Sequence, residues 1–124
     1  MYLATLLHES DGLQVTKEYY NPASEAAYGR YIGRGYIQLS SEANYRAASD
    51  YLGVDYVNNP EQVEHDPHAW NVSAWYWKDQ VHQHINDGFR ATVTRGIRPL
   101  EPHFERREEI YRNFCQAFNV AQQL

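Results

Sequence analysis

The sequence is short of the features that mark several large classes of protein. Cysteine occurs once, at Cys115, so an internal disulfide and a multi-cysteine metal site are both excluded. No apolar run approaches the ~20 residues needed to cross a membrane, and the apolar start MYLATLL is interrupted by His8 and Glu9. This start also lacks the charged segment and the cleavage site of a secretory signal peptide. We therefore expect a chain that is made in the cytoplasm and does not insert into a membrane.

Basic residues are also scarce. Lys and Arg total 11 against 16 Asp and Glu, which gives a net charge of −5. Nucleic-acid binders normally present a basic face, so no nucleic-acid partner is expected. The six histidines occur as HDPH (65–68), HQH (82–84) and single residues, without the spacing of a zinc enzyme. Neither a metal nor another cofactor is predicted.

The residues that are present suit one compact domain over residues 1–124. Apolar residues make up 43% of the chain and aromatic residues 15%, including eleven Tyr and three Trp. Tyrosine and tryptophan bury a large area and keep a polar group, so they serve cores and sugar-binding clefts equally well. Met1 falls inside the first predicted helix, which leaves open that an N-terminal segment of the helix is missing.

The hydrophobic pattern predicts a mostly helical fold with one small β element. A helix over 2–8 ends before Gly12, 11–30 is a polar loop with a turn at Asn21-Pro22, and 30–41 is a β-hairpin or bent strand. Helices follow over about 41–52, 67–81, 87–97 and 100–118. Ser41 and Asp66 are the predicted N-caps of the first two.

Two of these helices have a predicted apolar face. Trp70, Ala74 and Trp77 lie at spacings of four and three, so the aromatic residues of this helix are assigned to the core rather than to a sugar platform. Another set, Ile110, Tyr111, Phe114 and Phe118, lies on one face of the last predicted helix. Cys115 is assigned to packing, whereas Arg106, Arg107 and Arg112 alternate with glutamates as on a solvated face.

Two glutamates near the start are candidates for acid–base chemistry. Glycoside cleavage commonly uses one carboxyl group that donates a proton and a second, ionised one that activates water. An apolar helix end makes a charged carboxylate costly and suits the acid, whereas a polar loop suits the base. Glu9 follows ATLLH and Glu18 lies in QVTKEYY. Spacing alone does not distinguish this pair from surface charges, and Glu25 remains an alternative to Glu18.

The sequence around these glutamates resembles the family 19 glycoside hydrolases, which include plant-type chitinases and related phage and bacterial endolysins. The resemblance covers about residues 2–80 strongly and the remainder weakly. It rests on these blocks, in order: His8-Glu9-Ser10, Gly33-Arg34-Gly35-Tyr36-Ile37-Gln38-Leu39-Ser40, Asn44-Tyr45, Leu52-Gly53-Val54-Asp55, Asn59-Pro60-Glu61 and Ala74-Trp75-Tyr76-Trp77.

The resemblance implies a lysozyme-like, two-lobed helical domain with a cleft between the lobes. It implies Glu9 as general acid and Glu18 as general base in an inverting reaction, with Ser40 holding the attacking water. It places Gln38 and Asn44 at sugar-contacting positions. Two roles remain open for Arg34, which either contacts substrate or pins the β element to a carboxylate.

One late block departs from the family pattern. Family members carry Thr-Arg-x-Ile-Asn-Gly-Gly, but this chain has Thr94-Arg95-Gly96-Ile97 followed by Arg98-Pro99-Leu100. The change removes a sugar ligand and replaces two flexible positions by a rigid and a bulky residue. Arg98 is a candidate substitute donor, for instance to a carboxylate on a peptidoglycan stem.

Two classes of function follow. The favoured one is an inverting glycosidase that cleaves β-1,4 linkages of peptidoglycan in the cell wall, because the interval between Glu9 and Glu18 is short, as in endolysins. Such an enzyme would depend on a separate export or membrane-opening protein. Chitin oligomers are the alternative substrate. The second class is a glycan-binding or interaction module that keeps the fold without turnover.

Overall fold

The protein is described here by a computed structural model that covers residues 1–14, 16–98 and 103–124. Its α-helices are α1 (Tyr2–Glu9), α2 (Pro22–Tyr28), α3 (Glu42–Leu52), α4 (His68–Tyr76), α5 (Phe89–Thr92) and α6 (Phe104–Ala117). Short 3-10 turns form η1 (Pro60–Glu64) and η3 (His82–Asp87), and π-helical turns form η2 (Trp77–Val81) and η4 (Val93–Ile97).

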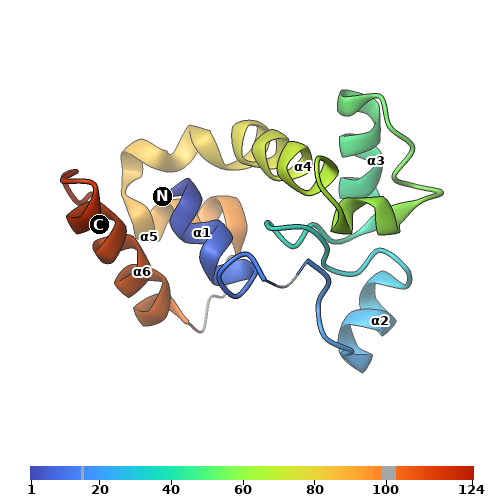
Figure 1. Cartoon of the computed structure of the whole chain (residues 1–124), viewed down its shortest axis with the longest axis horizontal. Helices are drawn as coiled ribbons and strands as arrows, with labels where there is room; N and C mark the ends of the chain where they lie inside the picture. The colour runs from blue at the N-terminus through green and yellow to red at the C-terminus, as the bar shows by residue number, and fades with distance from the viewer. Residues whose placement is uncertain (15, 99–102) are drawn as a thin grey trace.

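These elements form two lobes (Figure 1). One lobe holds α1, α5 and α6, and the other holds α2 and α3. α4 and the turns after it run along one side of the molecule and join the lobes. The mostly helical, two-lobed class predicted from the sequence is therefore confirmed.

Each lobe has its own hydrophobic cluster. The cluster between α3, α4 and the 36–39 segment consists of Leu6, Tyr36, Ile37, Leu39, Tyr45, Ala48, Tyr56, Val63, Ala69, Val72 and Trp75. The cluster between α1, α5 and α6 consists of Ala4, Phe89, Val93, Tyr111 and Cys115. α1 contributes to both clusters, through Leu6 and Ala4. The end of α1 therefore lies where the two lobes meet.

The boundaries of α3 follow its local sequence. The Ser41 side chain accepts a hydrogen bond from the backbone N–H of Asn44 at the start of the helix. Gly53 ends it with φ of +70°, a left-handed conformation that costs glycine little. Both ends are as predicted, because each depends on residues within one turn of the helix.

The segment predicted to be a loop over 11–30 contains a helix, α2. Asn21 caps it, since its side-chain Oδ1 accepts a hydrogen bond from the backbone N–H of Ala23 at 3.0 Å. Pro22 occupies the first helical position, where its missing N–H has no cost. Asn-Pro thus begins a helix here rather than making a simple turn, and the loop assignment was wrong over 22–28.

α4 begins at His68 and buries a different face from the one predicted. Asp66 does not cap it; its Oδ2 accepts a hydrogen bond from the hydroxyl of Tyr36 at 2.8 Å. The buried side chains are Ala69, Val72, Ser73 and Trp75. Trp70 remains 38% exposed, and its ring packs 4.8 Å from that of Tyr36. The predicted face through Trp70, Ala74 and Trp77 was wrong, because α4 packs against α3 and η1 with its other side.

The predicted β element is present in reduced form. Arg34 and Leu39 exchange two backbone hydrogen bonds of 3.0 and 2.8 Å and form an isolated antiparallel β-bridge. Arg34 forms a second isolated β-bridge with Lys17. Gly35 and Gln38 turn the chain between Arg34 and Leu39 with φ of +74° and +57°. The pairing stops at these isolated bridges.

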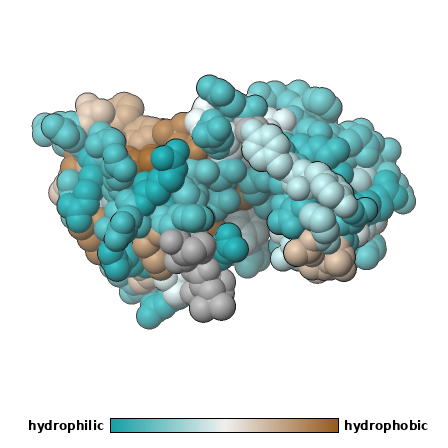
Figure 2. All heavy atoms as spheres, turned by 90° about the horizontal axis from the view of Figure 1, so that it is seen from below, coloured by the Kyte–Doolittle hydropathy of each residue, from teal (hydrophilic) through white to brown (hydrophobic). Residues whose placement is uncertain are grey.

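An apolar hollow of about 500 Å³ lies in the lobe that holds α1, α5 and α6, and it is lined by the start of α1, by η2 and η3, and by α6 with the residues after it. Figure 2 shows hydrophobic surface on the lobe that holds α1, α5 and α6. Its lining includes Leu3, Trp77, Phe114, Phe118 and Val120. Phe118, on the apolar face of the last helix, is 66% exposed. Among the described residues, no helix is long and apolar enough to cross a membrane.

Candidate active site

A polar cleft of about 500 Å³ lies between the lobes. It brings together residues from α1, α2, the 37–44 segment, α4 and η4. Its lining consists of Glu9, Glu18, Asn21, Ala23, Ser24, Ala27, Tyr28, Ile37, Gln38, Leu39, Ser40, Asn44, Tyr76, Ile97 and Arg98. Every predicted site residue is in this set except Arg34 and the alternative base Glu25. A carbohydrate needs polar groups at a concave surface, so this cleft suits it better than the apolar hollow beside α1 and α6 does.

Glu9 ends α1 and is held by an arginine from α6. Its Oε1 accepts a hydrogen bond from Nη2 of Arg107, in an ion pair. The side chains are 20% and 2% exposed, respectively. The sequence predicts an apolar setting for Glu9, but the structure places a buried guanidinium against it. The arginine fixes the direction of the carboxyl group, which the end of a helix alone would leave free to rotate.

Glu18 is anchored in the other lobe. Its Oε1 accepts hydrogen bonds from the backbone N–H of Gly33, at 3.1 Å, and from the hydroxyl of Ser24. The backbone N–H of Glu18 also donates to the carbonyl of Gly33 at 2.9 Å. Both side-chain partners are donors, which suits a carboxylate that acts as an acceptor. Glu25, the alternative base, lies on the other face of α2 and is not part of the cleft lining.

The 38–44 segment forms the floor of the cleft near Glu18. Gln38 donates from Nε2 to the carbonyl of Gly35 at 3.0 Å, which holds the amide beside the turn. Asn44 donates from Nδ2 to the backbone carbonyl of Ser40 at 2.9 Å. A Cβ atom at Gly33 would lie 2.8 Å from Oε1 of Gln38, so the absence of a side chain at Gly33 lets Gln38 occupy this position.

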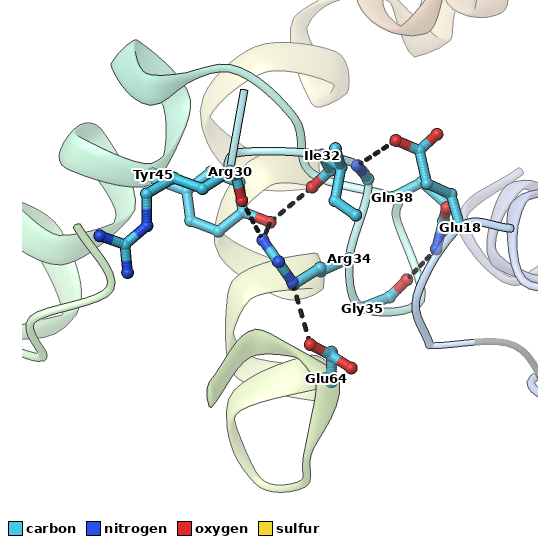
Figure 3. Close-up of polar contacts among 9 residues, drawn as sticks. Glu18, Arg30, Ile32, Arg34, Gly35, Gln38, Tyr45 and Glu64 are labelled. Carbon is cyan, nitrogen blue, oxygen red and sulfur yellow. Dashed lines mark hydrogen bonds and ion pairs between the residues drawn. The ribbon is translucent and has the colours of Figure 1, made fainter. Parts of the chain in front are cut away.

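Arg34 has a structural role rather than a place in the cleft (Figure 3). Its Nε donates to Oε2 of Glu64 at 2.9 Å, and its Nη1 donates to the carbonyl of Arg30 at 2.7 Å and to the hydroxyl of Tyr45 at 3.2 Å. Tyr45 in turn donates to the carbonyl of Ile32 at 2.7 Å, and burial raises its pKa to about 12. Arg34 therefore pins the segment that carries Gln38, and the substrate-contact role is not supported.

Tyr76 and Arg98 complete the wall opposite α2. The pKa of Tyr76 is raised, mainly by burial and secondly by the negative charge of Glu9. The Tyr76 hydroxyl and the Glu9 carboxylate therefore interact electrostatically across the cleft lining. Arg98 follows η4 with an extended backbone, and its side chain is exposed at the cleft. The first residue of the departure from the family pattern, Arg98, therefore lies in the site; Pro99 and Leu100 fall outside the described residues.

Comparisons with known proteins identify the family of this chain. The sequence matches the model of glycoside hydrolase family 19, chitinase class I, over residues 8–96. The chain belongs to this family. It is 34% identical over 103 residues to the acidic endochitinase SP2 of Beta vulgaris, a match that covers 77% of this chain and 36% of the relative. Chitinase 4 of Oryza sativa subsp. japonica is 31% identical over 99 residues, covering 74% and 35%.

Solved structures of the family have the same fold. Chitinase C from Streptomyces griseus HUT6037 superposes with a TM-score of 0.83 at 32% identity, covering 99% of this chain and 60% of the other. A bacterial family 19 chitinase superposes with a TM-score of 0.85 at 31% identity, covering 99% and 74%. The chain spans about a third of the length of the curated relatives it matches.

Two residues of the site, Arg107 and Tyr76, were not predicted from the sequence. Arg107 was assigned to a solvated face, but it is buried at 2% exposure, and its neighbour Glu108 is 9% exposed. Tyr76 was assigned to the core together with its helix. The signal available for Arg107 was weak: its neighbours alternate in charge as on an exposed helix, and its partner Glu9 is 98 residues away.

Proposed function

We propose that this chain is an inverting glycoside hydrolase that cleaves β-1,4 bonds between N-acetylated hexosamines, with chitin-type oligomers as substrate. The observation that carries the proposal is the convergence of Glu9 and Glu18, from different lobes, on one polar cleft that also contains Gln38, Ser40 and Asn44. The chitinase relatives support chitin over peptidoglycan as the polymer.

In this mechanism Glu9 is the general acid. Arg107 engages Oε1 of Glu9, which leaves the other carboxyl oxygen to deliver a proton to the leaving-group oxygen as the glycosidic bond breaks. Glu18 is the general base, which removes a proton from water as the water attacks the anomeric carbon from the opposite face. Ser40 holds that water, and Gln38 and Asn44 bind the sugar. Each cycle consumes one water and inverts the anomeric carbon.

The direct test is hydrolysis of the hexamer of β-1,4-linked N-acetylglucosamine, followed by proton NMR of the fresh products. Inversion predicts that the new reducing ends appear first as the α-anomer. Products that appear first as the β-anomer would contradict the inverting mechanism. A folded protein that binds the hexamer without cleaving it would instead support the glycan-binding module.

Peptidoglycan is a second candidate substrate, favoured by Arg98. An exposed guanidinium in the cleft can pair with a carboxylate, and peptidoglycan carries such groups on its muramic acid and stem peptides whereas chitin carries none. An enzyme of this kind would act at the cell wall and need a separate protein to reach it.

The Arg98→Asn variant, which restores the family residue, distinguishes the two substrates. If Arg98 recognises a carboxylate, we expect its rate of clearing outer-membrane-permeabilised Gram-negative cells, measured by turbidity, to fall about tenfold relative to its rate on the N-acetylglucosamine hexamer. Arg95→Asn, which changes an arginine that pairs with Asp87 outside the cleft, is the control. An unchanged ratio of the two rates would remove the case for a carboxylate-reading Arg98.

A further inference from the structure

α2 separates the cleft from a second hollow. Residues on one face of this helix line the cleft, whereas Glu25 on its other face lines a hollow of about 280 Å³. Glu18 and Asn21 line both spaces, so the two spaces adjoin at these residues. The full lining of the second hollow is Lys17, Glu18, Tyr19, Tyr20, Asn21, Glu25, Gly29 and Ile32.

Two adjacent tyrosines form an exposed aromatic surface at this hollow. Tyr19 and Tyr20 are 77% and 81% exposed. The tyrosines of the core behave differently: Tyr31, Tyr36 and Tyr45 each donate their hydroxyl to a carbonyl or carboxylate and are held in place. Aromatic rings bury a large area when they find a partner. Two such rings lie exposed side by side in the sequence at a hollow that adjoins the candidate active site, where a ligand could cover them.

The charges of the hollow favour a neutral ligand. The Lys17 ammonium is offset by the Glu25 carboxylate, and Glu18 adds a further acidic group at the boundary with the cleft. An anionic ligand would therefore meet no excess of positive charge. Asn21 and Lys17 offer hydrogen-bond donors, and a pyranose ring offers hydroxyl groups for them together with an apolar C–H face for an aromatic ring.

We propose that Tyr19, Tyr20 and the hollow behind α2 form an accessory subsite that stacks a neutral N-acetylhexosamine ring. The ring belongs to the same glycan chain whose scissile bond lies in the cleft, so this proposal rests on the proposed function. Binding at a position remote from the reacting bond supplies energy for orienting the chain. Long oligomers gain from the subsite, and short ones that fill only the cleft do not.

Binding of N-acetylglucosamine trimer and hexamer, measured by calorimetry on the background of Glu9→Gln, tests the subsite. We expect Tyr20→Ala to lower the ratio of hexamer to trimer affinity about tenfold, with a similar loss in Tyr19→Ala. Tyr20→Trp, which keeps an aromatic face, is expected to retain the ratio. Tyr51→Ala is the matched control, since Tyr51 is 63% exposed on α3 and lines neither space.

The outcomes separate this proposal from the proposed function. An unchanged affinity ratio in both alanine variants, an equal loss for both oligomers, or no binding of either oligomer overturns the subsite. Cleavage of the trimer and hexamer by the wild-type chain is measured separately. If the chain cleaves both and the ratio does not change, the subsite fails and the glycosidase stands; if the hexamer binds through Tyr20 and is not cleaved, the reverse holds.

Discussion

Glu9→Gln is expected to lower turnover of the N-acetylglucosamine hexamer by about 10²–10⁴-fold, the range associated with loss of a general acid. The amide cannot give up a proton to the leaving-group oxygen. Its carbonyl oxygen can still accept the hydrogen bond from Arg107, so the contact between α1 and α6 is kept, at a lower stability because the buried guanidinium loses its anion. The measurement is the initial rate of reducing-end formation, with circular dichroism to check that the variant is folded.

Two further variants accompany this experiment: Glu18→Gln tests the base, and Glu42→Gln is the surface control. Glu18→Gln removes the base and is expected to produce a loss of similar size. Glu42 lies at the exposed start of α3 and pairs with Arg46 at the surface, so Glu42→Gln is expected to leave the rate unchanged. Retention of wild-type turnover by a folded Glu9→Gln variant would exclude Glu9 as the acid.

Arg107→Ala is expected to lower the free energy of unfolding by about 3–5 kcal/mol, the cost of removing one partner from a buried ion pair. Arg107 is 2% exposed, and its removal leaves the Glu9 carboxylate without its cation and creates a cavity between α6 and α1. Turnover is expected to fall as well, because the acid loses the group that orients it. Urea denaturation followed by tryptophan fluorescence measures the stability change.

Arg106→Ala is the matched control, since it removes the same side chain from the preceding, exposed position of α6. We expect it to change the unfolding free energy by less than about 0.5 kcal/mol. Arg107→Met removes the charge but keeps much of the packing. We expect it to lower turnover as Arg107→Ala does, with a smaller loss of unfolding free energy. Equal stability of Arg106→Ala and Arg107→Ala would show that the pair with Glu9 does not contribute to folding.

Local features of the fold could be predicted from the sequence because neighbouring residues decide them. Ser41 and Gly53 bound α3 through contacts within one turn, and Gly12 has a φ of +73° after α1. The helix faces were harder to predict. α4 buries Ala69 and Trp75 rather than Trp70 and Ala74, because the side that packs depends on where α3 and η1 lie.

The sequence by itself determined the family, because its short blocks carry residue types that are tied to the chemistry of the family. It also predicted the pair Glu9 and Glu18, and the structure places both in one cleft. Only the tertiary structure showed that Arg34 pins the β element, that Arg107 holds Glu9, and that Tyr76 lies in the cleft. The physical reason is distance along the chain. A charged residue is solvated on an isolated helix, and it becomes buried and paired only when packing brings a partner from far along the chain, as α6 brings Arg107 to Glu9.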